Sequence, residues 1–223
     1  MTTSDDVSLY EGLITTRAIR RYVDQDIDVD DLNKMFFAAT RGPSGHNTQP
    51  LRFLVLRRTP DAEAARELLG RGFQEAWQAA RQEPDEADQS RPARMARTMN
   101  HFVDHIADAP VIVLALFRNT RGRTDIAAGS SLYPACQNLL LAARSMGYGG
   151  VITQWHFPVE QELADLLDFP DDVSIAATIP LGKPVGSHGA VRRLPLPDLV
   201  YEGRYGESAP WATDPPGTRY TGG

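Results

Sequence analysis

Alternating helical and strand-like segments in this sequence predict an α+β or α/β domain. Residues 111–117 form a run that is apolar on both faces, which is typical of a central strand. Leu32, Met35 and Ala39 recur at the spacing of one helix face. Residues 131–146 repeat apolar side chains over a longer stretch, which indicates a buried helix.

The composition is that of a globular protein. Hydrophobic residues make up 42% and charged residues 23% of the 223 residues, which argues against disorder as the overall state. A chain of this length is long for one small domain and short for two ordinary ones. We therefore expect one domain with elaborations.

Charge and cysteine content narrow the function classes. With 23 basic against 29 acidic residues, the net charge of −6 argues against binding to nucleic acid or to an anionic membrane. The single cysteine, Cys136, rules out a disulfide within the chain and a four-cysteine zinc site. Residues 1–6 are polar rather than a secretory leader, and the longest apolar run, 109–117, is too short to span a bilayer. We expect a cytoplasmic protein.

Helix caps, helix breakers and β-rich runs define the elements of the first half. Asp28 or Asp30 caps a helix that Gly42-Pro43 ends. Later, an Ala/Glu/Arg-rich helix precedes a polar, Pro-bearing loop. The expected elements are a helix at 10–16, a basic cluster at 17–21, the capped helix, a loop at 43–50, a strand at 51–57, a helix at 61–80, a loop at 82–92 and a helix at 94–106.

The second half continues the alternation. Asp108-Ala109-Pro110 separates the preceding helix from the apolar strand, and Gly147 is the expected stop of the long helix. An extended piece follows at 151–152, then a helix from Pro158 to Leu167 and a strand at 173–181. Residues 201–223 carry aromatic side chains without periodicity. We expect this tail to pack on the protein's own body or on a partner subunit.

Most familiar catalytic motifs are absent. The glycine-rich stretch at 147–150 follows a helix rather than a strand, so it is not a dinucleotide-binding fingerprint. His101 and His105 share a helix face but lack an obvious third ligand, which favours an exposed pair over a metal site. Cys136 lies in an apolar helix, where a buried and inert thiol is favoured over a nucleophile.

Two segments do carry chemistry. Arg17 and Arg20 are three residues apart, so their guanidinium groups can converge on one anion; two solvent-facing arginines are the simpler alternative. The loop 43–50 offers a hydroxyl, amides and backbone N–H groups in a turn bounded by prolines. It suits a polar, planar ligand, although a turn that satisfies its own backbone fits equally well.

In combination, the motifs of this chain resemble those of the nitroreductase family of flavoproteins, from about residue 10 to 205. They occur in the family's order. They are Arg17-Ala18-Ile19-Arg20-Arg21-Tyr22, Pro43-Ser44-Gly45-x-Asn47-x-Gln49-Pro50, Asp108-Ala109-Pro110, Gln137 to Ala143 with Met146 to Gly150, Ile179 to Pro184, and Arg192-Arg193-Leu194-Pro195-Leu196.

The resemblance implies an α+β three-layer sandwich with a mostly antiparallel sheet of four or five strands, and FMN bound at a homodimer interface. The nitroreductase-like FMN-binding domain covers 1–205, and an extended C-terminal tail covers 206–223. The family's cofactor contacts fall into three groups. These are Arg17, Ala18, Arg20 and Arg193 on the phosphate and ribityl chain, Pro43, Ser44, Gly45 and Asn47 of the other subunit along the flavin, and Ile152, Thr153 and Gln154 facing the ring with backbone N–H groups near N5.

The activity that the resemblance implies is an FMN-dependent oxidoreductase. NAD(P)H gives hydride to flavin N5 and is replaced, in ping-pong order, by a planar electron-poor acceptor such as a nitroaromatic or a quinone. Two alternatives are an FMN-sequestering protein, blocked by the 71–100 segment or by the Trp211 tail, and a non-flavin binding module. Thr16 and Ala18 depart from the family's pattern, which has a basic residue and a serine there, so fewer phosphate contacts are expected.

Overall fold

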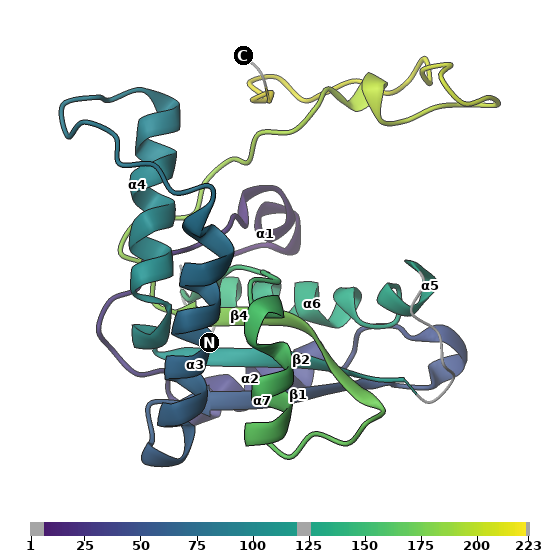
Figure 1. The fold of residues 1–223 in the computed structure, drawn as a ribbon. Helices are drawn as coiled ribbons and strands as arrows, with labels where there is room; N and C mark the ends of the chain where they lie inside the picture. Colours follow the sequence, from purple (N-terminus) through teal and green to yellow (C-terminus); the bar gives the residue numbers. More distant parts are fainter. Residues whose placement is uncertain (1–6, 120–125, 222–223) are drawn as a thin grey trace.

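The computed structural model describes residues 7–119 and 126–221. Its centre is a four-stranded sheet with the strand order β1-β2-β4-β3 (Figure 1). The strands are β1 (Leu51–Arg57), β2 (Val111–Arg118), β3 (Gly149–Gly150) and β4 (Val173–Gly182), and all neighbours pair antiparallel. The expected α+β class and antiparallel sheet are confirmed.

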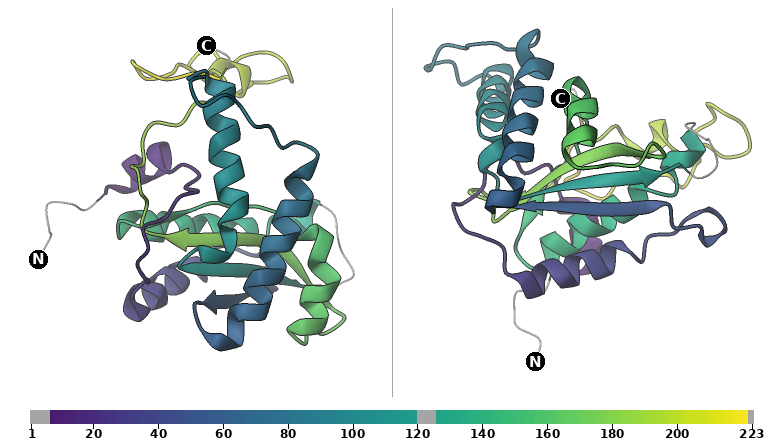
Figure 2. Two further views of the ribbon diagram at one scale, coloured as in Figure 1. Left: turned by 60° about the vertical axis from the view of Figure 1, so that its left-hand side comes forward. Right: turned by 60° about the horizontal axis from the view of Figure 1, so that its bottom comes forward.

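Helices cover both faces of the sheet and complete three layers (Figure 2). One core lies under α3, α4 and α7 and takes Leu114 from β2. The other lies under α2 and α6 and takes Val113. The described helices are α1 (Leu9–Thr15), α2 (Val29–Ala39), α3 (Pro60–Gln78), α4 (Arg91–Asp104), α5 (Ile126–Gly129), α6 (Tyr133–Ser145) and α7 (Glu160–Leu166), with short 3-10 turns at Gly45–Asn47, Ile106–Asp108, Phe157–Val159 and Leu196–Asp198.

The alternation of β2 explains why its sequence is apolar throughout. Successive residues point to opposite faces, and both faces are covered, so all of Val111 to Leu116 is buried. The pairing of β2 with β4 shifts register between Ala115 and Leu116. This bulge leaves Ile175 in the first core and Ala177 in the second.

One helix start and one strand differ most from the sequence-based expectation. Helix α4 begins at Arg91 rather than at residue 94, because Ser90 caps it and proline is compatible with a first helical turn. Gly149 and Gly150, expected in a turn, form the edge strand β3. A Cβ at Gly150 would collide with the carbonyl oxygen of Pro180, so glycine allows the two backbones to approach.

Other local expectations are confirmed. Asp28 is the cap of α2, since its side chain accepts the Asp30 N–H at 2.7 Å. Gly147 ends α6 with a φ of +81°. Cys136 is fully buried in α6, and burial raises the pKa of its thiol to about 12.

The tail leaves the body of the molecule beyond the sheet (Figure 1). Trp211 is 64% exposed and Tyr205 is 94% exposed. The segment is organised by local backbone pairing, since isolated β-bridges join Arg193 to Tyr220 and Tyr201 to Ser208. Within this chain the tail therefore offers its aromatic side chains outward. No helix among the described residues is long and apolar enough to cross a membrane.

Candidate functional site

The basic segment after α1 is held against the edge strand β3. The Ile19 N–H donates to the Gly150 carbonyl at 2.9 Å. The Tyr22 hydroxyl donates to the carbonyl of Ile19 at 2.7 Å and reaches that of Pro180 at 3.2 Å. Arg20 therefore projects from a backbone that is fixed to the sheet, next to the residues that follow β3.

A cavity of about 530 Å³ lies between Arg20 and the segment after β3. It brings together four residues that the sequence resemblance assigned to the cofactor. Aromatic and thioether side chains from α4 and from the loop before α7 form much of the remaining wall. Its lining is Arg20, Met99, Phe102, Val151, Ile152, Thr153, Gln154, Trp155 and Phe157.

Arg20 has an unpaired hydrogen-bond donor at this cavity. Its Nε is buried and has no hydrogen-bond partner among the described residues. Its guanidinium carbon is 6.0 Å from the centroid of the Phe102 ring, and burial lowers the pKa of Arg20. Since a guanidinium stays charged at neutral pH, the arrangement favours an anionic or electron-rich ligand beside an aromatic wall.

The turn at 152–154 is rigid, but one of its expected donors is occupied. Thr153 exchanges two backbone hydrogen bonds with Thr178, at 3.0 and 2.8 Å. The Thr153 N–H is therefore already paired within the chain, so it is not the backbone donor of this turn that a ligand would meet. Gln154 is also engaged, because its Nε2 donates to the Tyr133 hydroxyl at 2.8 Å.

The side chain of His156 holds this turn against β4. The ring is fully buried, and its Nε2 lies 3.0 Å from the Ile175 carbonyl, so Nε2 carries the proton. The Thr178 hydroxyl then donates to Nδ1 at 3.1 Å. Burial lowers the pKa of His156 to about 4. The neutral imidazole thus ties the turn to β4.

The loop 43–50 lines a different cavity, of about 400 Å³, between α2 and β1. The Gly45 N–H donates to Ser131 Oγ at 3.0 Å, which joins the loop to the start of α6. His46, Asn47 and Gln49 have φ values of 52°, 54° and 48°. Three non-glycine residues in the left-handed region store strain, and such strain clusters at functional sites.

Polar groups of this loop largely satisfy one another. Ser44 Oγ accepts the Gln49 N–H at 3.0 Å, and Gln49 Nε2 donates to Asn47 Oδ1 at 3.1 Å. The self-capping turn that the sequence left open is therefore realised. Pro43, Gly45 and Asn47 are exposed on this chain, and none of the three lines the Arg20 cavity.

The remaining predicted residues lie apart from the cavity. Arg17 and Ala18 are exposed beside α1. Arg193 is exposed in the tail, where its Nη1 donates to the Arg192 carbonyl at 2.8 Å. The structure thus places Arg20 and the 152–154 turn at one cavity. The other residues of the phosphate group and the whole 43–47 group lie outside this cavity.

Sequence reasoning missed several residues around the site. Met99 and Phe102 of α4 line the cavity, in the stretch where no motif could be matched. Arg144 and His188 are half-buried near the 16–17 segment, and each has a buried side-chain nitrogen that lacks a partner among the described residues. The sequence did contain a signal for Arg144, since it is the one charged residue in the otherwise uncharged stretch from Asn138 to Val151.

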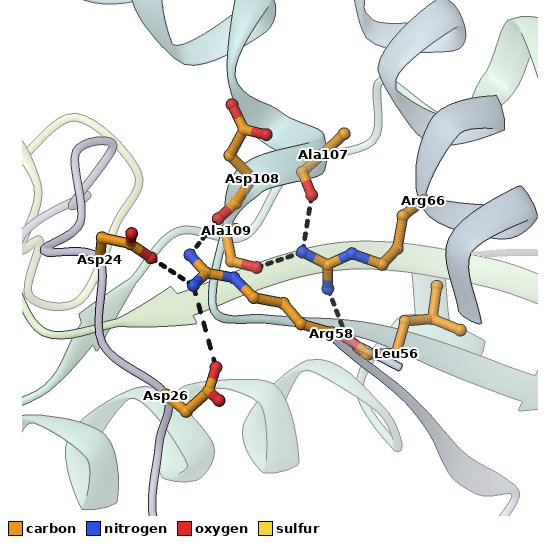
Figure 3. Close-up of polar contacts among 8 residues, drawn as sticks. All are labelled: Asp24, Asp26, Leu56, Arg58, Arg66, Ala107, Asp108 and Ala109. Atoms are coloured by element: carbon orange, nitrogen blue, oxygen red, sulfur yellow. Dashed lines mark hydrogen bonds and ion pairs between the residues drawn. The ribbon is translucent and has the colours of Figure 1, made fainter. Parts of the chain in front are cut away.

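A second arginine cluster, made of Arg58 and Arg66, has hydrogen-bond partners for its terminal guanidinium nitrogens (Figure 3). Arg66 of α3 donates to the carbonyls of Leu56, Ala107 and Ala109. Arg58 donates to Asp24 and to the Asp108 carbonyl. These contacts tie α3 and the end of β1 to the start of β2. They border a cavity of about 760 Å³ that Arg20 also reaches.

Comparisons with known proteins agree on one family. A family model described as Nitroreductase family matches residues 13–183. A relative from Methanothermobacter thermautotrophicus, named "Putative NADH dehydrogenase/NAD(P)H nitroreductase", is 26% identical over 198 residues, which cover 87% of this chain and 86% of the relative.

Solved structures share the fold. One from Desulfovibrio desulfuricans, described as "a putative nitroreductase in complex with fmn", has a TM-score of 0.65 at 24% identity and covers 92% of this chain and 99% of its own. NADPH:FMN oxidoreductase from Vibrio harveyi, solved with NAD+, has a TM-score of 0.65 at 21% identity. The match covers 90% of this chain and 79% of the oxidoreductase chain.

Proposed function

The chain belongs to the nitroreductase family, and from this premise we propose that it is an FMN-dependent oxidoreductase with NAD(P)H as hydride donor. The names of its relatives support this activity, since they describe NAD(P)H nitroreductases and an NADPH:FMN oxidoreductase. The structure adds physical support at the Arg20 cavity, where a half-buried cation lies beside an aromatic wall.

The single observation that carries the proposal is the partnerless Nε of Arg20 at a cavity lined by Phe102, Trp155 and the 152–154 turn. FMN is an anionic molecule with a planar aromatic ring, so an orphaned guanidinium and stacking surfaces fit its two ends. Trp155 is itself held by a stack on Trp77, with ring centroids 5.4 Å apart. The residues present therefore fit this cofactor.

The proposed contacts follow the three groups of the sequence resemblance. Arg17, Ala18, Arg20 and Arg193 would hold the phosphate and ribityl chain, while the turn Ile152, Thr153 and Gln154 would border the ring. FMN, when bound, supplies the hydride-transfer chemistry. The chain's own contribution is positional: Thr178 and His156 fix the turn, and the aromatic wall excludes water.

We propose a planar, electron-poor acceptor such as a nitroaromatic or a quinone, in ping-pong order with NAD(P)H. Met99, Phe102, Trp155 and Phe157 support this class, because apolar and aromatic walls select flat apolar molecules. Donor and acceptor would use the same space in turn, which requires the first product to leave before the second substrate enters.

A homodimer would complete the site. Pro43, Ser44, Gly45 and Asn47 are proposed to reach the flavin of the partner subunit, which agrees with their position outside the Arg20 cavity. Exposed apolar side chains support such an interface, since Leu9 is 74% exposed and the tail presents Trp211. Deleting residues 201–223 should weaken the dimer, as measured by its mass in solution at decreasing concentration; an unchanged mass would contradict the tail's role.

The test of the activity is a visible absorption spectrum of the purified protein before and after anaerobic NADH or NADPH. A flavin band that bleaches supports the oxidoreductase and identifies the donor. A band that persists with both donors supports sequestration instead. No band, even after added FMN, contradicts the proposal.

A further inference from the structure

Three polar atoms without partners lie around the start of the basic segment. Thr16 Oγ1, Arg144 Nε and His188 Nδ1 are each buried and lack a hydrogen-bond partner among the described residues. An unsatisfied buried polar atom costs free energy comparable to a lost hydrogen bond, and such atoms are rare in native proteins. Three in one region mark a place where a ligand or ordered water would satisfy them.

Backbone contacts bring the three residues together from distant parts of the chain. The Gly189 N–H donates to the Thr15 carbonyl at 3.2 Å, so His188 lies beside Thr16. The imidazole Nε2 of His188 is 3.1 Å from the Tyr148 carbonyl, just after the end of α6, where Arg144 also lies. The segment after β4, the segment after α1 and the end of α6 therefore meet here.

The charge of this region is predominantly positive. Burial lowers the pKa of His188, and the nearby cations Arg144 and Arg17 lower it further. The side chain of Arg144 is only 17% exposed, and its Nη2 is 3.8 Å from Glu11 Oε1, beyond hydrogen-bond distance. The half-exposed Glu11 carboxylate thus lies near Arg144 alone, while Arg17 adds a second positive charge near His188, so a further negative charge would be favourable here.

We propose that Arg144, His188 and Thr16 form, with Arg17, the pocket for the phosphate group of FMN, an inference that rests on the proposed function. A phosphate offers several acceptor oxygens, which match the guanidinium and hydroxyl donors. Because Nε2 of His188 donates to a carbonyl, its Nδ1 is the ring nitrogen that faces a ligand. A bound phosphate dianion would favour the imidazolium form, which takes its proton from solvent and donates the Nδ1–H to a phosphate oxygen.

This assignment also explains how the chain can bind the phosphate without the family's basic residue and serine at positions 16 and 18. Thr16 stands where the family resemblance expects a basic residue, and Ala18 where it expects a serine. Arg144 and His188 supply a cation and a polar nitrogen from the opposite wall. The phosphate pocket would thus be moved onto α6 and the segment after β4 rather than lost.

The test compares FMN with riboflavin, which lacks the phosphate, by titrating flavin-free full-length protein and following flavin fluorescence. Arg144→Gln should raise the Kd for FMN roughly 10- to 100-fold and leave the Kd for riboflavin unchanged. Glu11→Gln should act in the opposite direction and tighten FMN by roughly two- to fivefold. Arg71→Gln, which alters an exposed arginine on α3, is the matched control and should change neither constant.

A structural role for Arg144 would produce a different pattern, since Arg144→Gln and Glu11→Gln would then weaken both flavins together. An unchanged ratio of the two dissociation constants in Arg144→Gln overturns this inference alone. If Arg144→Gln does not fold, His188→Gln is measured in the same way, and an unchanged ratio there overturns it equally. Wild-type protein that binds neither flavin overturns the proposed function as well.

Discussion

Arg66 and Arg144 are both arginines with little solvent exposure, yet their surroundings differ completely. Arg66 is 5% exposed and donates to three backbone carbonyls from two segments (Figure 3). Arg144 keeps a buried Nε without a partner among the described residues. Arg20 resembles Arg144 in this respect. The comparison suggests a general distinction: a buried arginine with filled donors holds the fold together, whereas one with an empty donor is prepared for a ligand.

The largest expected effect is on Arg66. Arg66→Met should lower the free energy of unfolding by about 3–5 kcal/mol, because the carbonyls of Leu56, Ala107 and Ala109 lose their donor inside the core. Urea unfolding of the flavin-free protein measures it. The FMN affinity of the folded fraction should stay unchanged. A loss below about 1 kcal/mol would place Arg66 in the same class as a surface arginine.

The next effect concerns a buried group that is neutral rather than charged. The folded-state pKa of His156 is about 4, below its ordinary value of 6.5. Between these values only the unfolded state binds the proton, so stability should fall by about 3 kcal/mol as the pH drops from 7 to 4. Urea unfolding at both pH values tests this. His156→Gln should be less stable at pH 7 and should lose less on acidification; an identical pH dependence would contradict the assignment.

Substituting Arg20 should have the opposite pattern to substituting Arg66, with a loss of FMN affinity and no loss of stability. Arg20→Ala should weaken FMN by about 30-fold, corresponding to about 2 kcal/mol, because a charge-assisted contact is lost. The unfolding free energy of the flavin-free protein should not decrease, since the Arg20 Nε has no partner to lose among the described residues. Flavin titration and urea unfolding give the two values. Arg21→Ala alters the exposed neighbour and serves as the control. Flavin content equal to wild type would refute the role.

The smallest effect is expected at Arg58, which borders the same cavity as Arg66. Its partner Asp24 is 92% exposed, so solvent and salt screen the ion pair. Arg58→Gln should cost less than about 1 kcal/mol, and this cost should shrink further in 1 M salt. Urea unfolding at low and high salt measures it. A cost equal to that of Arg66→Met would show that burial is not what separates the two arginines.

The sequence predicted those parts of the fold that local patterns encode. The strand expected at 51–57 coincides with β1, and the one at 111–117 with β2 apart from one residue. It placed the start of α4 three residues late, because a proline was taken as a loop signal although it fits a first helical turn. It missed β3, since two glycines carry no strand propensity and pair only because of the space around them.

The site was predictable only in its residue types. The resemblance named Arg20 and residues 152–154, and these line one cavity because the backbone bond from Ile19 to Gly150 holds the basic segment against β3. It did not indicate that the Thr153 N–H is occupied by Thr178, because that pairing depends on the register of β4. The cofactor contacts themselves stay predictions, and the flavin titrations described above test them.

By itself, the sequence determined most of the helices and strands and the faces that they bury, because these properties follow from the polarity and spacing of near neighbours. The family motifs belong to this level. Only the tertiary structure decided which arginines are satisfied. The surroundings of Arg144 come from Glu11, Tyr148 and His188, and those of Arg66 from Leu56 and Ala107. The free energy of a buried charge depends on groups within a few ångströms, and folding draws those groups from distant parts of the chain.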